Sequence, residues 1–304
     1  MEFASPASPC QLIHSELFPG IQLCIKRDDL LHATVSGNKF RKLKYPLQHI
    51  QQQGAAVLSM GGVWSNHIHA LAFACQRLGI AVKAFIRGEA ETAMLADCRA
   101  WGMEIEFVSR QDYRQLRALP AYWGQYVNQP NTVWVPEGGS SALALTGVAE
   151  LVDELPFIPD YIWCAAGTAA TLAGIVQGLR GRAEAIGVTA IAQGDYLHAE
   201  VARLLKENQQ TDWQNYRLIC DQHLGGYAVV NQELRDFCEQ FLQHSGILCE
   251  PVYTGKALMA LSRECQRGAF KSGATVCFIH TGGLQGLRGF PDWPGNPPGL
   301  SLNV

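Results

Sequence analysis

The sequence lacks the features of a membrane-spanning or nucleic-acid-binding protein. No apolar run is long enough to cross a bilayer. No long run of basic or acidic residues is present, and the net charge of the 304 residues is only −3 at pH 7. This charge pattern gives little attraction to nucleic acid or to an anionic membrane surface. We therefore expect neither as a partner.

Paired cysteine motifs are also missing. The chain has ten cysteines but no CxxC pair, and most stand singly in apolar runs, as Cys24, Cys75, Cys164 and Cys277 do. Single cysteines in apolar segments are typical of reduced thiols in a protein core. The pattern argues against a disulfide framework or a zinc site, and it favours a cytoplasmic protein.

Complete nucleotide-binding and hydrolase motifs are absent as well. The chain has no GxxxxGK[ST] loop, no GxGxxG loop and no GxSxG turn. A plain nucleotide-binding protein and a serine hydrolase are therefore disfavoured.

What the chain does contain is enough apolar residues for a large core. It is 48% hydrophobic and 17% charged, a composition that argues against disorder. Its length allows two domains of ordinary size or one large domain.

From about Gly54 onward, short β-like runs alternate with helical patterns. The expected strands are 55–60, 80–86, 103–108, 132–135, 161–165, 186–191 and 275–279. The expected helices are 67–78, 91–101, 112–125, 142–155, 168–179, 197–207, 231–244 and 255–267. This alternation predicts an α/β protein with parallel strands and helices on both faces. Ligands bind such sheets beyond the carboxyl ends of the strands, and we expect the four loops below to lie there.

The first loop, Ala166–Thr171, connects a strand to a helix. Its small residues let the backbone approach an anion, and the hydroxyls of Thr168 and Thr171 with the first helical N–H groups can hold a phosphate monoester. An ordinary helix start explains the pattern equally well on local grounds.

The second loop, Gly61–His67, presents a hydroxyl and an amide at a strand-to-helix turn. Ser65 and nearby backbone N–H groups are suited to a carboxylate. His67 and His69 lie two positions apart on a helix and point in different directions, so we expect no shared metal ion. A partly buried helix position is the preferred interpretation of His69.

The third loop, Tyr253–Lys256, has a second tyrosine upstream at Tyr227. A phenol beside glycine can pass a proton or stack on a ring, although core packing is the commoner role of a tyrosine. The fourth loop, His280–Gly283, ends a buried strand and leaves room for a planar ligand, or it is a simple tight turn.

A lysine-rich stretch follows Ser36-Gly37-Asn38. A lysine behind this flexible lead, with its pKa lowered by cations nearby, can form a Schiff base. The residues alone favour a basic amphipathic helix start with solvated lysines. They also do not distinguish Lys39, Lys42 and Lys44 as the reactive residue.

Six motifs in this order resemble one family. They are KRDDL at 26–30, SGNKFRKL at 36–43, SNH at 65–67, PEGGSSALALTG at 136–147, VYTGK at 252–256 and HTGG at 280–283. Together they resemble the pyridoxal-phosphate enzymes that include 1-aminocyclopropane-1-carboxylate deaminase and D-cysteine desulfhydrase. The resemblance covers nearly the whole chain. It is weakest at 167–171, where the family usually has more glycine.

The resemblance implies the tryptophan-synthase β-like fold, also called PLP fold type II. In this fold, two doubly wound parallel-sheet domains hold pyridoxal 5'-phosphate between them. By this likeness, residues 42–146 form a small domain, and residues 1–41 and 147–304 form a large cofactor-binding domain. The likeness also implies a homodimer and a small amino acid as substrate.

The resemblance also implies a role for each motif residue. Lys39 would form the Schiff base, which selects it over Lys42 and Lys44. The remaining implied contacts are Asn66 with the cofactor's 3-hydroxyl, Ser65 with the substrate carboxylate, Gly167, Thr168, Ala169, Ala170 and Thr171 with the phosphate, Tyr227 and Tyr253 with the substrate, Thr254 with the pyridine nitrogen, and Thr281 with the cofactor.

Two threonines bear on the activity within this family. Cyclopropane-opening deaminases resemble this chain but carry Glu in place of Thr254 and Leu in place of Thr281. A hydroxyl does not stabilise a protonated pyridine as a carboxylate does. We therefore expect D-cysteine desulfhydrase-like α,β-elimination, which gives pyruvate, ammonia and hydrogen sulfide.

Three alternatives stay open. The first is a 1-aminocyclopropane-1-carboxylate deaminase. The second is an enzyme that catalyses β-elimination from another substrate, such as L-serine, β-chloroalanine or cysteate. The third is a non-catalytic relative that only binds the cofactor or another phosphate compound, suggested by the sparse glycine of 167–171 and by His67-Ile68-His69.

Overall fold

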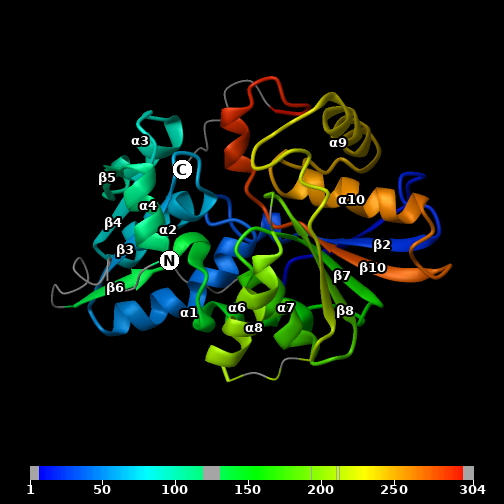
Figure 1. Ribbon diagram of the computed structural model, residues 1–304, viewed down its shortest axis with the longest axis horizontal. Helices are drawn as coiled ribbons and strands as arrows, with labels where there is room; N and C mark the ends of the chain where they lie inside the picture. The colour runs from blue at the N-terminus through cyan, green and yellow to red at the C-terminus, as the bar shows by residue number, and fades with distance from the viewer. Residues whose placement is uncertain (1–6, 119–130, 193, 210, 212, 297–304) are drawn as a thin grey trace.

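The computed structural model describes residues 7–118, 131–192, 194–209, 211 and 213–296. Two β-sheets lie side by side, each covered by helices (Figure 1). The fold class expected from the sequence, two doubly wound parallel-sheet units, is confirmed. Residues 119–125 of the expected helix 112–125, and residues 1–6 and 297–304 of the expected large domain, lie outside the described residues.

The smaller sheet has four parallel strands, on the left of Figure 1. Their order is β5 (Glu104–Val108), β4 (Val82–Arg87), β3 (Ala56–Gly62) and β6 (Thr132–Val135). One face packs against α2 (Asn66–Leu78) and α3 (Ala93–Ala100), together with the apolar side of α1 (Asn38–Gln52). The other face packs against α4 (Arg110–Ala118) through Met60, Phe85, Tyr113 and Leu116.

The larger sheet has six strands. Their order is β1 (Cys10–Ile13), β2 (Ile21–Lys26), β10 (Ala274–Ile279), β7 (Tyr161–Ala166), β8 (Glu184–Thr189) and β9 (Tyr216–Ile219). One face is covered by α6 (Ala142–Asp153), α7 (Ala170–Leu179) and α8 (Tyr196–Glu207), and the other by α9 (Gln232–Ser245) and α10 (Thr254–Gln266) (Figure 1). Three short 3₁₀ helices complete the described elements: η1 (Asp28–Leu30), η2 (Glu137–Gly139) and η3 (Leu284–Gly289).

The expected strands and helices are present with shifted ends. β8 begins and ends two residues before the expected strand, and the first helical turn after β7 begins at Ala170. Three points differ from the expectation. The sequence pattern did not reveal β1, β2 or β9, and β1 pairs antiparallel with β2. The loop at Tyr253 does not follow a strand, because residues 246–250 form no sheet pairing among the described residues.

Two helices connect the sheets. α1 and α6 pack tightly because Gly147 has no side chain: a Cβ there would lie 2.1 Å from the Arg41 carbonyl oxygen. The expected domain limits, 41/42 and 146/147, fall inside these two helices. The division into domains therefore stays a prediction.

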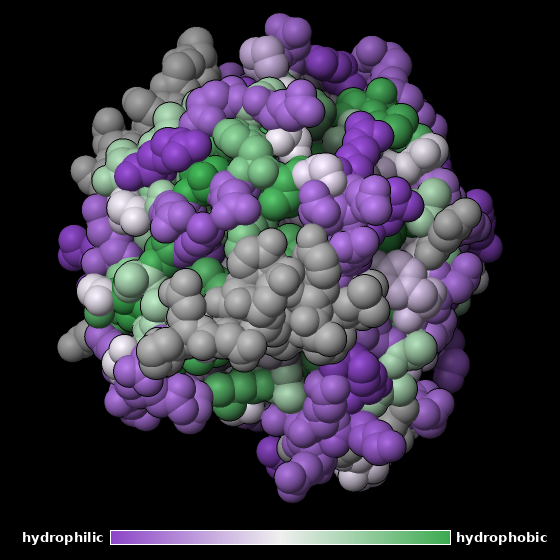
Figure 2. Space-filling view, turned by 60° about the vertical axis from the view of Figure 1, so that its left-hand side comes forward, coloured by the Kyte–Doolittle hydropathy of each residue, from purple (hydrophilic) through white to green (hydrophobic). Residues whose placement is uncertain are grey.

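In the described ranges, no helix has the length and apolarity needed to span a bilayer, and no three His, Cys, Asp or Glu side chains gather as metal ligands. On the face shown in Figure 2, hydrophobic residues form separate patches between hydrophilic ones.

Candidate active site

A cavity of ≈ 380 Å³ lies where loops from both sheets meet. Its walls come from the start of α1, the β3–α2 loop, η2, the β7–α7 loop and the segment after β10. The residues of the sequence-based site that line it are Lys39, Ser65, Asn66, Gly167, Thr168, Tyr227, Tyr253 and Thr281. Ala169, Ala170, Thr171 and Thr254 lie behind this wall. The structure thus brings most of the expected residues together.

A glycine sets the position of Lys39 in the first turn of α1. Gly37 has a positive φ of 61°, and a Cβ there would lie 1.9 Å from the Thr281 carbonyl oxygen. The next residue, Asn38, donates its backbone N–H to the same oxygen at 3.2 Å. Only glycine allows this close approach. The end of β10 therefore fixes where the lysine enters the cavity.

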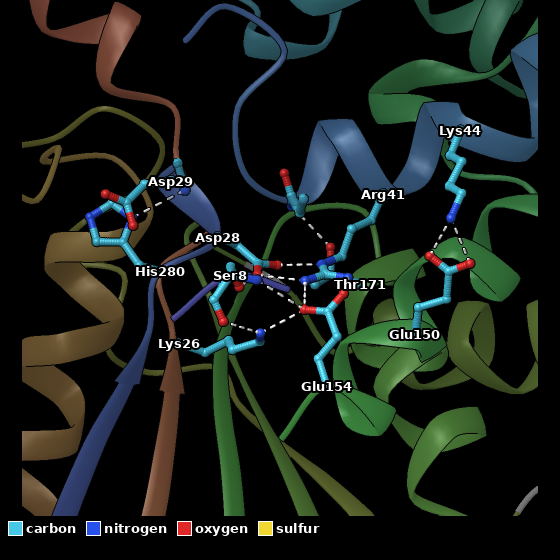
Figure 3. Close-up of polar contacts among 12 residues, drawn as sticks. Ser8, Lys26, Asp28, Asp29, Arg41, Lys44, Glu150, Glu154, Thr171 and His280 are labelled. Carbon is cyan, nitrogen blue, oxygen red and sulfur yellow. Dashed lines mark hydrogen bonds and ion pairs between the residues drawn. The ribbon is translucent and has the colours of Figure 1, made fainter. Parts of the chain in front are cut away.

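A buried ionic network supports the same turn from behind (Figure 3). Arg41 donates to both carboxylate oxygens of Asp28, at 2.6 and 2.8 Å, and to Glu154 at 2.8 Å. Glu154 also accepts from Lys26 at 2.6 Å. The Asp28 carbonyl oxygen accepts the Gly37 N–H at 3.0 Å. The network therefore connects β2, η1, α1 and the C-cap of α6.

Burial, and not nearby cations, changes the acidity of Lys39. Desolvation lowers the pKa of its amine to about 8, while Glu137 acts in the opposite direction. We expected positive neighbours to lower it, but Arg41 binds Asp28 and Glu154, and Lys44 pairs with Glu150 at 2.8 Å, as Figure 3 shows. Within the described chain, the Lys39 amine has no hydrogen-bond or ion-pair partner. It is available as a nucleophile or base.

Lys42, which the residues alone left open as an alternative reactive lysine, also lines the cavity. It is 2% exposed, and its Nζ lies 3.2 Å from the Thr168 hydroxyl and 3.4 Å from the Gly138 carbonyl oxygen. In the described ranges it has no carboxylate partner. Burial first, and Lys39 second, hold the pKa of its amine well below the usual range. Its spacing of three from Lys39 on a helix was the available signal, since such residues share a face.

The β7–α7 loop lies beside Lys42. A Cβ on Gly138 would lie 2.7 Å from the Thr168 side chain, and a Cβ on Gly167 would lie 3.1 Å from the Tyr253 ring. Ala169 adopts a positive φ of 58° as α7 begins. Thr171 points toward α1 and accepts a hydrogen bond from Asn38 at 3.0 Å. A helix N-terminus, a hydroxyl and an unpaired lysine thus converge, which suits a phosphate.

The start of α2 supplies polar groups on the opposite wall. Ser65 caps the helix by accepting the Ile68 N–H at 3.3 Å. Asn66 accepts from Gln285 Nε2 at 2.5 Å through its Oδ1, which leaves its amide N–H groups free. Both side chains border the cavity.

His67 is neutral and buried in this wall. The Ser59 hydroxyl donates to the Val135 carbonyl oxygen at 2.8 Å, so it accepts from His67 Nε2 at 2.9 Å. Its Nδ1 has no partner among the described residues. Burial, with the charges of Lys39 and Lys42, keeps the pKa of His67 well below its usual range.

The two expected tyrosines both reach the cavity. The rings of Tyr227 and Tyr253 meet edge to face with centroids 5.9 Å apart. Burial raises the pKa of both phenols, that of Tyr253 well above its usual value. Both are therefore protonated at neutral pH and can donate a proton.

Thr254 faces away from the cavity. It is fully buried, its N–H donates to Glu250 Oε1 at 2.6 Å, and its hydroxyl lies 3.1 Å from the same oxygen. Glu250 also accepts the N–H groups of Val252 and Tyr253, so it caps the start of α10. The sequence did not single out Glu250, although an acid just before a helix start is a capping signal.

Charged residues surround the cavity mouth. Glu137 accepts from Tyr113 and Arg117, both at 2.5 Å. Arg87, at the end of β4, lies over the Tyr113 ring at 5.3 Å and has no carboxylate partner among the described residues. The sequence did not indicate Arg87 or Arg117, because neither belongs to a motif.

The residues present fit pyridoxal 5'-phosphate. A buried amine with a lowered pKa suits its aldehyde, and Lys42, Thr168 and the start of α7 form a separate anion site for its phosphate. Gly282 and Gly283 line the same cavity without side chains, which lets the backbone approach a flat ring closely.

Comparisons with known proteins agree with this fit. Residues 6–282 match the family model described as pyridoxal-phosphate dependent enzyme. The chain is 32% identical to a Thermotoga maritima protein named "Putative 1-aminocyclopropane-1-carboxylate deaminase", over 88% of this chain and 90% of that protein. It is 30% identical to the Arabidopsis thaliana "Bifunctional D-cysteine desulfhydrase/1-aminocyclopropane-1-carboxylate deaminase, mitochondrial", over 90% of this chain and 76% of that protein.

A solved structure has the same fold. The crystal structure titled as that of an ACC deaminase homologue superposes with a TM-score of 0.86 at 27% identity, and the match covers 96% of this chain and 94% of that one. With the family match, this establishes both the cofactor and the type of enzyme. The chain belongs to the pyridoxal-phosphate dependent enzyme family, as a lyase or deaminase of the 1-aminocyclopropane-1-carboxylate deaminase/D-cysteine desulfhydrase type.

Proposed function

We propose that the protein is a D-cysteine desulfhydrase-like lyase that converts D-cysteine and water into pyruvate, ammonia and hydrogen sulfide. One observation carries this proposal: the described cavity wall offers no free carboxylate to a protonated pyridine. Glu137 is the only acid in that wall, and Tyr113 and Arg117 hold it. Thr254, in place of the deaminase glutamate, bonds to Glu250 behind the wall.

Without a free carboxylate to stabilise a protonated pyridine nitrogen, the cavity favours elimination over the opening of a cyclopropane ring. When bound, pyridoxal phosphate supplies an electron sink for the carbanion at the substrate Cα. A weaker sink is sufficient when the β-substituent leaves with its own electron pair, as hydrosulfide does. Opening a cyclopropane ring demands a stronger sink. The cavity therefore supports elimination.

We assign the cofactor contacts from the same geometry. Lys39 would attach the cofactor through its aldehyde, and Asn66 would donate to the 3-oxygen. Lys42, Thr168 and the first N–H groups of α7 would hold the phosphate. Thr281, which borders the cavity, would contact the cofactor.

The substrate contacts follow from the remaining groups. Ser65 and the N-terminus of α2 bind the substrate carboxylate. The Lys39 Nζ accepts the α-proton, because its lowered pKa leaves a share of the amine neutral near pH 8. Tyr253 or Tyr227 donates a proton to the departing sulfur, since both phenols are protonated.

The test compares two lysines of α1. Lys39→Ala should remove the visible absorbance of the lysine-bound cofactor and all turnover of D-cysteine, measured as pyruvate and sulfide. Lys44→Ala, which changes a lysine paired with Glu150, should retain both. A Lys39→Ala protein that keeps the absorbance band and turnover would contradict the assignment. Turnover of 1-aminocyclopropane-1-carboxylate in preference to D-cysteine would contradict the choice of substrate.

A second candidate substrate is suggested by Arg87. A guanidinium without a carboxylate partner at the cavity mouth suits an anionic β-substituent, such as the sulfonate of cysteate. Elimination from cysteate gives pyruvate, ammonia and sulfite. If this substrate is used, Arg87→Met should lower kcat/KM for cysteate by about tenfold to hundredfold. Arg99→Met, at an exposed ion pair with Glu91, is the control.

Three further points remain proposals. We propose the division into residues 42–146 and residues 1–41 with 147–304, a homodimeric assembly, and a cytoplasmic location. Light scattering coupled to gel filtration measures the assembly directly.

A further inference from the structure

A chain of polar side chains runs from the cavity to the contact between the two sheets. Asn66 Oδ1 accepts from Gln285 Nε2 at 2.5 Å. Gln285 Oε1 accepts from Arg288 Nη2 at 3.2 Å. Arg288 Nη1 pairs with Asp97 Oδ2 at 2.7 Å, and the same oxygen lies 3.1 Å from His69 Nε2. Asn66, His69 and Asp97 belong to α2 and α3, while Gln285 and Arg288 belong to η3.

Arg288 sets the direction of the two hydrogen bonds that lead from it through Gln285 to Asn66. A guanidinium donates and cannot accept, so the Gln285 atom facing it must be the carbonyl oxygen. The Gln285 amide nitrogen then faces Asn66, and Asn66 must present its own oxygen to accept. The Asn66 Nδ2 is left pointing away from Gln285. The amide orientation of Asn66 thus follows from a charge two side chains away.

Asp97 and His69 hold Arg288 in place. Burial lowers the pKa of His69 to about 4, so its ring is neutral and donates from Nε2 to Asp97. Its Nδ1 has no partner in the described part of the chain. Arg288 is 13% exposed, and its guanidinium is oriented by the Asp97 carboxylate.

Backbone packing prevents Asn66 from turning freely. A Cβ on Gly283 would lie 2.5 Å from Asn66 Nδ2, and a Cβ on Gly286 would lie 3.7 Å from its Oδ1. Gly283, which precedes η3, and Gly286 within it thus lie close to the two ends of the amide. Gly283 also borders the cavity.

We infer that Gln285 and Arg288 are positioning residues that fix the Asn66 amide with its N–H toward the cavity. The inference rests on the proposed contact between Asn66 and the cofactor's 3-oxygen. An oxygen that carries negative charge requires a donor, and a carbonyl oxygen in the same place would repel it. Gln285 and Arg288 themselves touch no reacting atom.

The decisive variant is Gln285→Glu. A carboxylate still accepts from Arg288 but cannot donate to Asn66, so the Asn66 amide must reverse and turn its oxygen to the cavity. We expect the dissociation constant of pyridoxal phosphate, measured by fluorescence without substrate, to rise by about tenfold or more. The absorbance maximum of the bound cofactor should shift. Gln76→Glu, on the exposed end of α2, is the matched control and should change neither.

Variants of Arg288 distinguish its effect on hydrogen-bond direction from the effect of its side-chain bulk. Arg288→Met keeps the side-chain bulk but removes the donor, so Asn66 should occupy both orientations and cofactor affinity should fall less than in Gln285→Glu. Arg288→Lys retains a donor and should restore part of the affinity. In an Asn66→Ala background, Gln285→Glu should have no further effect, because the group it acts through is gone.

The outcomes distinguish this inference from the proposed function. If Gln285→Glu matches the wild type in affinity and spectrum while Lys39→Ala loses its absorbance, the positioning role is wrong and the function stands. If the wild type does not bind pyridoxal phosphate at all, the proposed function fails first. An equal effect of Gln285→Glu with and without Asn66 would show a general packing role and would also overturn the inference.

Discussion

Lys39 combines accessibility to the cavity with removal from water. Its amine has no partner among the described residues, and burial lowers its pKa to about 8. A paired lysine would be more stable but less reactive. Burial of this amine therefore lowers the stability of the folded protein while it makes the amine more reactive.

This lowered pKa predicts the pH dependence of cofactor attachment. Only the neutral amine attacks the aldehyde, and its fraction rises as pH approaches and passes about 8. The rate of reconstitution of the cofactor-free protein should therefore increase from pH 6 to about 8 and then level off. Absorbance after mixing with pyridoxal phosphate measures it. A rate that keeps rising toward pH 10.5, the usual lysine range, would contradict the shift.

Replacing Lys42 should change protein stability and cofactor binding in opposite directions. Its folded pKa lies well below the unfolded value, so folding at neutral pH must overcome the burial of an unpaired amine. Lys42→Met should raise the free energy of unfolding of the cofactor-free protein by about 0.5–2 kcal/mol in urea titrations. It should also weaken retention of pyridoxal phosphate. Lys44→Met is the control and should do neither, because Lys44 is paired outside the cavity.

At the scale of elements, α1 is held at its start from two directions. Gly37 and Asn38 contact Thr281 at the end of β10, and Arg41 contacts Asp28 and Glu154. Lys39 lies between these anchors, and Lys42 directly follows Arg41. The direction of both cavity lysines thus depends on a helix terminus that has no freedom to rotate.

The buried network predicts a large effect of Arg41→Met. This change leaves Asp28, which is fully buried, and part of Glu154 without their main partner. Loss of one member of a buried ion pair costs about 3–5 kcal/mol, which urea unfolding can measure. Glu150→Gln, at the half-exposed pair with Lys44, should cost no more than about 1 kcal/mol. Similar losses for both variants would contradict the role of burial.

At the scale of the whole molecule, η3 contacts the helices of the smaller sheet through Arg288 and Asp97. This ion pair joins segments far apart in the chain. It is partly exposed, so its contribution is modest.

We expect that removing the charge of Asp97 lets the η3 segment open more often. Asp97→Asn should speed amide hydrogen exchange in residues 284–289 by about fivefold, the equivalent of ~1 kcal/mol. Exchange in β3 and β4 should not change, because these strands belong to a different core cluster from Leu287 of η3. Glu91→Gln removes an exposed pair near the same helix and serves as control. Uniform acceleration across the chain would indicate a global loss of stability instead.

The sequence was sufficient for some of these features and not for others. Strand-loop order predicted that Ser65, Gly167 and Thr281 lie beyond the carboxyl ends of their strands, and these ends of the two sheets meet at the cavity. Motif resemblance selected Lys39. Roles for Lys42 and Gln285 were not predicted, because each depends on contacts with residues far away in the chain.

Side-chain direction was the other limit. Thr254 stands in a recognised motif, yet its hydroxyl turns to Glu250, because a helix start with a nearby acid offers a better partner than the cavity. Periodicity likewise did not reveal β1, a four-residue strand at an edge of the sheet, since so short a segment has no clear alternation.

The position of β10 has a consequence for biosynthesis. β2 lies between β1 and β10, and β10 is the last strand of the described chain. During translation, the strands of the smaller sheet have all been made by residue 135. β2 cannot pair with β10 until residues 274–279 have left the ribosome. Thr281, which seats the turn before Lys39, emerges later still. Lys39 is therefore synthesised early but positioned late, so a nascent chain cannot bind the cofactor through it before β10 and Thr281 have been made.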